Sequence, residues 1–341
     1  MHARDASASG LPRDLLVRGE DRKDLIRVGK AAFVRSRDWD EADGRERFRL
    51  RAVAFGLCLG DDAYLTGEAA ALLLELPLVD DPVGLPIAIR PGNAHTGHDR
   101  SPYGRVRHGY LPPTCRTERV RVRVVSPAFC AVDIARHLGP RDGLVVADAV
   151  LHRGIEREAM TAIAEHMLAY PGIATVAWVA ENADPRVESP LESLGRYAFL
   201  AAGRPAPLNN VWIRGGSDWY RVDHLLPDDG VVLEGDGGLK YRNRPDADKI
   251  VGDEKERERL LRSAGFGVVR YTWADAIARP GQLLHRVQEA KRLRHNQPVP
   301  TGWRLDPPWV EDGRRPADEG QRRADDGRRR ADDGRRWTED G

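Results

Sequence analysis

Cysteine is one of the residues that this 341-residue sequence has little of. The three cysteines, Cys58, Cys115 and Cys130, are odd in number and widely spaced. That pattern excludes a disulfide framework and a CxxC metal site, and it is typical of proteins from a reducing compartment. We therefore expect a cytoplasmic protein.

Long hydrophobic runs are also missing. The longest apolar stretch, AAALLLELPLV, is too short to span a bilayer and contains Glu75. The first 30 residues carry charges throughout and lack the apolar core of a signal peptide. We expect neither export nor a membrane partner.

Lysine is scarce as well, with six residues among the 54 Lys and Arg. The formal net charge is +1, which excludes a generally polycationic nucleic-acid-binding protein. Any basic surface must therefore be local and built from arginine. Lys240 becomes conspicuous, because it follows two glycines at the end of an apolar motif, VVLEGDGGLK.

The C-terminal end, by contrast, is rich in charge. Residues 311–341 contain 9 Arg against 10 Asp and Glu, and they end in four sevens, RRPADEG, QRRADDG, RRRADDG and RRWTEDG. No apolar seam supports a coiled coil, and no core can offset the entropy of ordering. We expect 297–341 to be a disordered linker and tail, either an interaction arm or a drifting repeat expansion.

Residues 1–47 are weakly patterned. Leu25, Ile26 and Val28 form a short apolar stripe at helical spacing, and a strand is expected at Ala32–Arg35. Residues 48–185 alternate helix and strand signals, which indicates an α+β middle domain.

One strand of this middle domain carries a candidate basic surface. In RVRVRVVSP, Arg119, Arg121 and Arg123 alternate with valines, which predicts a half-buried strand with an arginine face. That face could bind DNA or an acidic partner, or simply face solvent.

Residues 186–296 alternate more regularly, in the order α-β-β-β-α-β-α. Ser189 is expected to cap the first helix, and Pro190 to occupy its first position. Two strands are joined by the turn Pro227-Asp228-Asp229-Gly230. The pattern predicts an α/β fold.

Acidic residues cluster on this hairpin. Asp223 precedes the turn, while Glu234 and Asp236 follow it on one strand face. Glu192, on the preceding helix, is a further candidate. Crowded carboxylates need a cation, and oxygen ligands suit Mg²⁺ or Mn²⁺. With Lys240 beside them, the residues favour metal-assisted phosphodiester hydrolysis.

Each of these residues also has a structural explanation. Glu192 completes a capping box by accepting from the Ser189 backbone N–H. Asp223 could pair with a nearby arginine, Asp236-Gly237 is a common turn, and Lys240 could be solvated. These alternatives stay open at this point.

The charged helix DEKERERLLRSAG offers Arg257 and Arg262 as phosphate contacts. Interleaved glutamates favour a solvated face with ion pairs instead. His224 points to the opposite strand face from Asp223 and is expected to be a packed core histidine.

The quoted residues resemble a known family. SPLES, VDHLLPDDGVVLEGDGGLKY and ERERLLRSAGFGVVRYTWAD look like the PD-(D/E)XK endonuclease domain related to very-short-patch repair (Vsr) nucleases. LTGEAAALLLELPL, SPAFCAVDIAR and LVVADAVLHRG resemble the middle domain of AbiEi-like antitoxins, and residues 12–35 look like a degenerate winged-helix start. The resemblance covers roughly residues 12–290.

The resemblance implies a three-layer nuclease domain over 186–296, with Asp223 and Glu234 as ligands of Mg²⁺ or Mn²⁺. It implies that Glu192 orients or completes the site. Asp236 stands where many of these enzymes carry lysine, which makes Lys240 a displaced substitute, and Gly235 replaces a bulkier apolar residue.

Two functions follow. The first is a Mg²⁺-dependent DNA endonuclease. The alternative is an AbiEi-type DNA-binding regulator or antitoxin with an inactive nuclease-like domain and a nucleotidyltransferase toxin as its partner. Both share one fold, and a fold does not determine a function.

Overall fold

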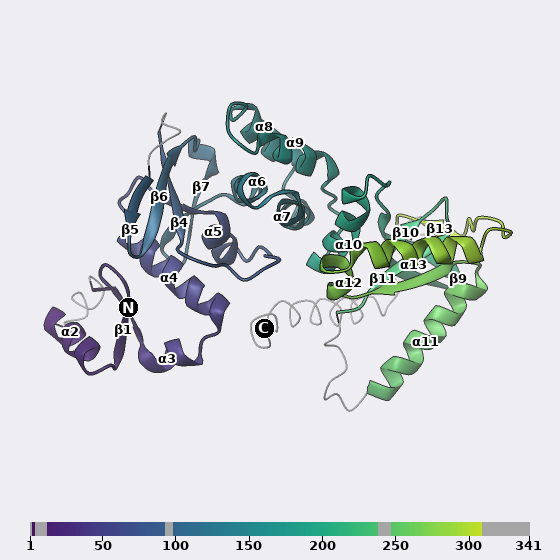
Figure 1. The fold of residues 1–341 in the computed structure, drawn as a ribbon, viewed down its shortest axis with the longest axis horizontal. Helices are drawn as coiled ribbons and strands as arrows, with labels where there is room; N and C mark the ends of the chain where they lie inside the picture. The colour runs from purple at the N-terminus through teal and green to yellow at the C-terminus, as the bar shows by residue number, and fades with distance from the viewer. Residues whose placement is uncertain (1, 4–11, 93–97, 238–246, 309–341) are drawn as a thin grey trace. The chain divides into compact units, whose positions relative to one another are not determined.

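The computed structural model describes residues 2–3, 12–92, 98–237 and 247–308 (Figure 1). The chain divides into two compact units between Ala183 and Asp184, whereas the sequence led us to expect a boundary before residue 186. Both units combine helices with sheets, so the expected α/β class is confirmed.

The first unit opens with a small α–β–β–α segment. The expected helical stripe at Leu25–Val28 is wrong, because these residues form a strand that pairs antiparallel with the next one. The strand expected at Ala32–Arg35 is confirmed. Leu16 and Phe33 bury each other against Leu25, which joins the first helix to the hairpin. The elements are α2 (Arg13–Asp21), β1 (Leu25–Gly29), β2 (Ala32–Arg35) and α3 (Ser36–Glu41).

A six-stranded mixed sheet in the order β5-β6-β4-β3-β8-β7 and a group of helices make up the rest of this unit (Figure 1). Its strands are β3 (Tyr64–Thr66), β4 (Ile87–Pro91), β5 (His98–Ser101), β6 (Gly104–Gly109), β7 (Arg116–Arg119) and β8 (Val122–Val125). Its helices are α4 (Gly44–Cys58), α5 (Gly67–Leu73), α6 (Pro127–Leu138), α7 (Pro140–His152), α8 (Arg157–Glu165) and α9 (Ile173–Asn182), with a 3₁₀ turn at Pro113–Cys115.

The predicted arginine-faced strand over 119–124 is wrong. Val120 and Arg121 both have positive φ, at 52° and 61°, and they turn the chain between β7 and β8. Two consecutive left-handed residues are the signature of a type I′ hairpin turn, which reverses the strand direction. Arg123 lies on β8 and pairs with Asp61. The DNA contact expected of Arg119, Arg121 and Arg123 stays a prediction, now for a hairpin end.

A buried ion-pair cluster lies in the core of the first unit. Asp133 on α6 is 2% exposed and accepts hydrogen bonds from Thr66 Oγ1 at 2.6 Å and Arg107 Nη2 at 2.5 Å. His137 Nδ1 lies 3.2 Å from the same carboxylate. Burial alone would raise the pKa of Asp133, but Arg107, His137 and Thr66 outweigh it and hold that pKa well below its usual range.

The second unit contains a five-stranded sheet in the order β12-β11-β10-β9-β13, in which only β11 and β12 are parallel. Helices α10, α12 and α13 gather on one face, and α11 packs on the other (Figure 1). The elements are α10 (Pro190–Ala201), β9 (Leu208–Gly215), β10 (Asp218–Leu226), β11 (Val231–Gly235), α11 (Ala247–Ser263), β12 (Gly267–Tyr271), α12 (Trp273–Ile277), α13 (Pro280–Leu293) and β13 (Trp303–Arg304).

The expected linker from residue 297 is wrong in its first part. Trp303 and Arg304 form β13 and pair antiparallel with β9. Trp303 and Leu305 pack on the core of the second unit, so their apolar surface offsets the cost of ordering this stretch. That core consists of Val211, Ile213, Val222, Leu225, Val232, Leu261 and Phe266. The repeat tail from residue 309 onward lies outside the described residues.

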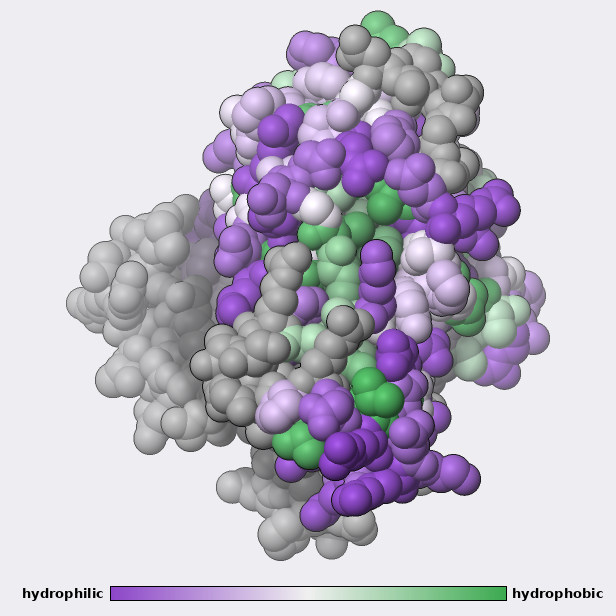
Figure 2. Space-filling view, turned by 90° about the vertical axis from the view of Figure 1, so that its left-hand side faces the viewer, coloured by the Kyte–Doolittle hydropathy of each residue, from purple (hydrophilic) through white to green (hydrophobic). Residues whose placement is uncertain are grey.

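No helix among the described residues is long and apolar enough to cross a membrane. The face of the molecule shown in Figure 2 is coloured mainly as hydrophilic residues, with smaller hydrophobic groups between them. This agrees with a sequence in which 31% of the residues are charged.

Candidate active site

The hairpin of β10 and β11 positions two of the predicted acids. The strands pair antiparallel, and Gly230 closes the turn by donating its N–H to the Pro227 carbonyl at 3.2 Å. Asp223 lies on β10 and Glu234 on β11. Asp223 Oδ2 accepts the Gly235 N–H at 2.8 Å, which ties the first acid to the residue after the second. The two acids therefore lie on neighbouring strands of one hairpin.

Close packing explains why residue 235 is a glycine. A Cβ at this position would lie 3.2 Å from both the Leu191 side chain and the Tyr271 hydroxyl. A Cβ at Gly195 would overlap the same hydroxyl. The two glycines allow α10, the end of β11 and Tyr271 to approach closely.

Glu192 lies in the first turn of α10, where Ser189 Oγ caps the helix by accepting the Glu192 N–H at 3.3 Å. The predicted capping box is wrong in one contact. The Glu192 carboxylate accepts from the Glu188 N–H at 3.1 Å in place of the Ser189 N–H, and from Ser189 Oγ at 2.8 Å. Asn210 Nδ2 donates to it as well, at 3.0 Å.

This carboxyl is buried beside another acid. Burial and the charge of Asp223 raise the pKa of Glu192 to about 8, even though Ser189, Asn210 and Arg221 oppose the shift. The structure therefore places Glu192 close enough to Asp223 for the two charges to repel each other. A carboxyl that titrates near neutral pH is more typical of a functional site than of a helix cap.

Tyr271, at the end of β12, lies beside α10 and contacts the Leu191 carbonyl at 3.2 Å. Its ring is fully buried, and burial together with the charges of Asp223, Glu192 and Glu234 raises the pKa of its phenol well above the usual value. Three acids, from α10, β10 and β11, thus act on one phenol. We call Glu192, Asp223 and Glu234 the acid group.

A buried polar chain supports Tyr271 from behind. His224 is fully buried, as expected, and its Nε2 lies 2.8 Å from the Tyr271 hydroxyl. Its Nδ1 lies 2.8 Å from Asn209 Oδ1, while Asn209 Nδ2 donates to Asp184 at 2.6 Å. Burial lowers the pKa of His224 to about 3, so the ring is neutral.

Because Asn209 Oδ1 can only accept, His224 Nδ1 carries the hydrogen of the neutral ring and Nε2 is an acceptor. The single hydrogen of the Tyr271 hydroxyl lies within reach of both His224 Nε2 at 2.8 Å and the Leu191 carbonyl at 3.2 Å. The phenol is thus held neutral under the acid group.

Arg257 neutralises one member of the acid group. Its Nη2 donates to Glu234 Oε1 at 2.9 Å and also contacts the Arg221 carbonyl. Arg262 pairs with Glu258 at 2.9 Å, as the ion-pair interpretation of this helix expects. The phosphate contacts expected of Arg257 and Arg262 stay a prediction.

The remaining predicted residues are only partly placed. Asp236 follows the last residue of β11, and its N–H donates to the Tyr271 carbonyl at 2.7 Å, which extends the β11–β12 pairing by one bond. Lys240 lies outside the described residues. The structure thus groups Glu192, Asp223 and Glu234, and it places Asp236 next to them along the chain.

The acid group suits a hard divalent cation in its donor chemistry, since it consists of carboxylate oxygens alone. Asp223 Oδ1 makes no hydrogen bond or ion pair among the described residues. However, no three His, Cys, Asp or Glu side chains in the described ranges are arranged as a metal site. Asp223 and Glu234 would hold a cation only after Glu234 releases Arg257.

Sequence reasoning missed the supporting residues Asn209, Asn210 and Tyr271. The signal was present in LNNVW, because two asparagines inside an apolar strand must find buried partners. Asn210 also has a positive φ of 50°, and the β9–β10 pairing skips it opposite Asp223.

Comparison with models of known protein families and with curated protein sequences finds no match for this chain.

Proposed function

We propose that the second unit is a Mg²⁺-dependent DNA endonuclease of the Vsr-like PD-(D/E)XK type, acting in the cytoplasm. The observation that carries the proposal is that Asp223 and Glu234 lie on the paired strands of one hairpin, tied through the Gly235 N–H, while buried Glu192 on α10 has a pKa raised by burial and by the charge of Asp223. The resemblance of residues 189–275 to that family supports it.

The roles of the residues follow from their contacts. Asp223, with its free Oδ1, and Glu234 are the candidate ligands of Mg²⁺ or Mn²⁺. When bound, the cation supplies charge stabilisation and an activated water for phosphodiester hydrolysis. Arg257 holds Glu234 in the meantime and prevents two unpaired acids from facing each other.

Glu192 is suited to hold a proton. Its Oε2 accepts two N–H groups, from Glu188 and Asn210. In the neutral form the proton therefore belongs on Oε1, from which it can donate to Ser189 Oγ. A carboxyl with a pKa of about 8 can give up or take a proton at neutral pH, as a general acid or base requires.

The test is calorimetric titration of the purified chain with Mn²⁺, followed by plasmid nicking with the same samples. Asp223→Ala/Glu234→Ala should lose both metal binding and nicking. Asp228→Ala, an exposed acid in the turn of the same hairpin, is the matched control and should keep both. A wild-type chain that neither binds metal nor nicks DNA would overturn the proposal.

The runner-up is a DNA-binding regulator or antitoxin of the AbiEi type. The ion pair between Arg257 and Glu234 favours it, because a permanently neutralised acid is what an inactive descendant of a nuclease site would show. On this proposal the chain binds one promoter, cleaves nothing and pairs with a nucleotidyltransferase toxin. Promoter binding without metal and without nicking would select it.

A further inference from the structure

A hollow of about 560 Å³ lies where α12 meets α13, and the acid group does not use it. It is lined by Asp275, Arg279, Gly281, Gln282, His285 and Arg286. Two of these six residues are arginines and one is an aspartate. The hollow is therefore basic in a chain whose net charge is close to zero.

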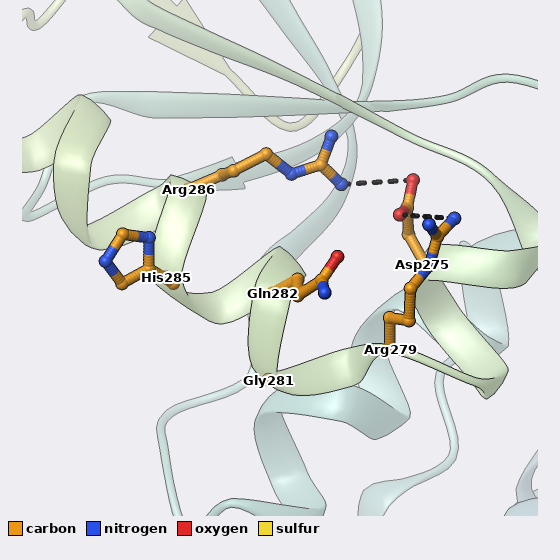
Figure 3. Close-up of a pocket in the computed structure, with 6 residues that line it drawn as sticks. All are labelled: Asp275, Arg279, Gly281, Gln282, His285 and Arg286. Carbon is orange, nitrogen blue, oxygen red and sulfur yellow. Dashed lines mark ion pairs between the residues drawn. The ribbon is translucent and has the colours of Figure 1, made fainter.

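Asp275 organises the two arginines. Arg286 Nη2 lies 3.0 Å from Asp275 Oδ2, and Arg279 Nη2 lies 3.3 Å from Oδ1. Figure 3 shows Arg286 reaching the carboxylate from α13 and Arg279 reaching it from the turn before that helix. One acid thus fixes two guanidiniums from different directions.

Asp275 is itself firmly held. It is 8% exposed, and it accepts the Thr272 N–H and hydroxyl at 3.0 Å each in the capping box of α12. The carboxylate is thus built into the start of a helix, so it can hold the arginines without being displaced by them. An anchor of this kind lowers the entropy that the long side chains lose on binding a ligand.

Most donor groups of the two arginines remain available. Each guanidinium has five N–H donors, and each uses one nitrogen on Asp275. Among the described residues neither guanidinium has another hydrogen bond or ion pair. The side chains of Arg279 and Arg286 are 50% and 44% exposed, so their remaining donors face the hollow and solvent.

Gln282 adds an uncharged donor to the same place. Its amide points from α13 toward Asp275 and Arg279 in Figure 3, and it has no hydrogen bond within the described ranges. His285 points away from Asp275 and lines the edge of the hollow. Guanidinium forks with an amide beside them match the oxygens of phosphate groups.

We infer that this hollow binds phosphodiester groups of DNA and seats the strand next to the acid group. The inference rests on the proposed function for its choice of DNA. The hollow and the acid group are linked through β12. Tyr271 is the last residue of this β-strand, and the next residue, Thr272, caps α12. Helix α12 also packs on α10, which carries Glu192.

The experiment measures fluorescence anisotropy of a short labelled DNA duplex with the full chain, in Ca²⁺ to prevent cleavage, over a series of salt concentrations. The test variant is Arg279→Gln/Arg286→Gln. The control is Arg259→Gln/Arg292→Gln, which removes the same charge from two arginines that pair with glutamates three residues earlier. Inorganic phosphate is titrated in parallel as a competitor.

The test variant should bind DNA roughly tenfold more weakly, and its salt slope should fall by about 2, since each phosphate contact contributes about 0.9. The control should bind as the wild type does. If the test variant fails to fold, Gln282→Glu replaces it, because it keeps both arginines and adds a charge that repels phosphate at the hollow, and it should weaken binding as well.

Equal affinity and salt slope in wild type and test variant would overturn the inference, as would an equal loss in the control. Competition by inorganic phosphate at low concentration would also overturn it, by showing a site for the free ion. Loss of DNA binding in the test variant, with no nicking by the wild type in Mg²⁺, would support this surface and reject the nuclease. If the wild type nicks DNA and the test variant binds DNA normally, the nuclease is supported and the hollow is rejected as a DNA-binding surface.

Discussion

Asp133 in the first unit and Glu192 in the second are both buried carboxyls that accept several hydrogen bonds. Their surroundings stabilise the negative charge of Asp133 and destabilise that of Glu192. Asp133 has Arg107 and His137 against it, and its pKa lies well below the usual range. Glu192 has neutral donors and a neighbouring acid, and its pKa is raised to about 8.

The difference separates a structural acid from a candidate site acid. Asp133 is compensated by the Arg107 guanidinium and stays charged, so the pair holds β6 and α6 together. Glu192 is buried at a cost in folding stability that its own contacts do not offset. Such a cost persists where the group serves a ligand or a reaction. Four predictions test this contrast.

The largest effect is expected for Asp133→Asn. Removing the charge leaves the largely buried Arg107 guanidinium without its ion-pair partner, which should cost about 3–5 kcal/mol of unfolding free energy. Urea denaturation followed by circular dichroism measures it. Glu158→Gln, an exposed acid on α8, is the control and should change little. A loss below about 1 kcal/mol would show that the neighbours of Asp133 do not stabilise its negative charge.

Thr66→Val should have the next largest effect. It removes one hydrogen bond to the charged Asp133 while keeping the side-chain volume, so we expect a loss of about 1.5–3 kcal/mol at neutral pH. The sign depends on ionisation. Since the folded pKa of Asp133 is depressed, its stabilisation is present above the unfolded pKa of about 3.9 and disappears as the pH falls below it. The difference between variant and wild type should therefore shrink in acid.

Glu192→Gln should show the opposite pH dependence. The folded carboxyl keeps a proton that the unfolded chain releases above about pH 4.5, so wild-type stability falls as the pH rises toward 8. The amide does not titrate. The variant should thus gain stability relative to wild type between about pH 5 and pH 9, by more than the roughly 1.4 kcal/mol that one pKa unit contributes. Parallel urea curves across that range measure it, and parallel pH profiles of the two proteins would contradict it.

The smallest effect is expected for Ser189→Ala. It removes the cap of α10, which should cost about 1 kcal/mol. It also removes the Ser189 hydroxyl from Glu192, so the pKa of Glu192 should rise further. NMR titration of the labelled carboxyl measures that shift. An unchanged or lowered pKa would show that Ser189 does not help to hold the negative charge.

Much of the second unit could be predicted from the sequence, because its signals are local. The turn Pro227–Gly230 sets the register of β10 and β11. Ser189 and Pro190 begin α10 where expected. These features depend on residues within a few positions of one another.

The misses arose where pairing across the chain overrides local pattern. Alternating Arg and Val over 119–124 satisfies the strand template, but the chain reverses at Val120 and Arg121 despite the absence of glycine. The apolar stripe at Leu25 forms a strand because Ala32–Arg35 is beside it. Asn209 and Tyr271 join His224 only in the folded sheet, so no spacing rule indicates them.

The contact of Tyr271 with Leu191 spans 80 residues, and it bears on how the protein is made. A ribosome that adds roughly 5–20 residues per second needs about 4–16 s between these two positions. Until β12 has been made, α10 lacks the Tyr271 side chain against which it packs in the folded unit. The first unit can complete its fold during synthesis, whereas the packing around the acid group is complete only when β12 has paired with β11. A growing chain therefore carries no assembled site until most of its length has been translated.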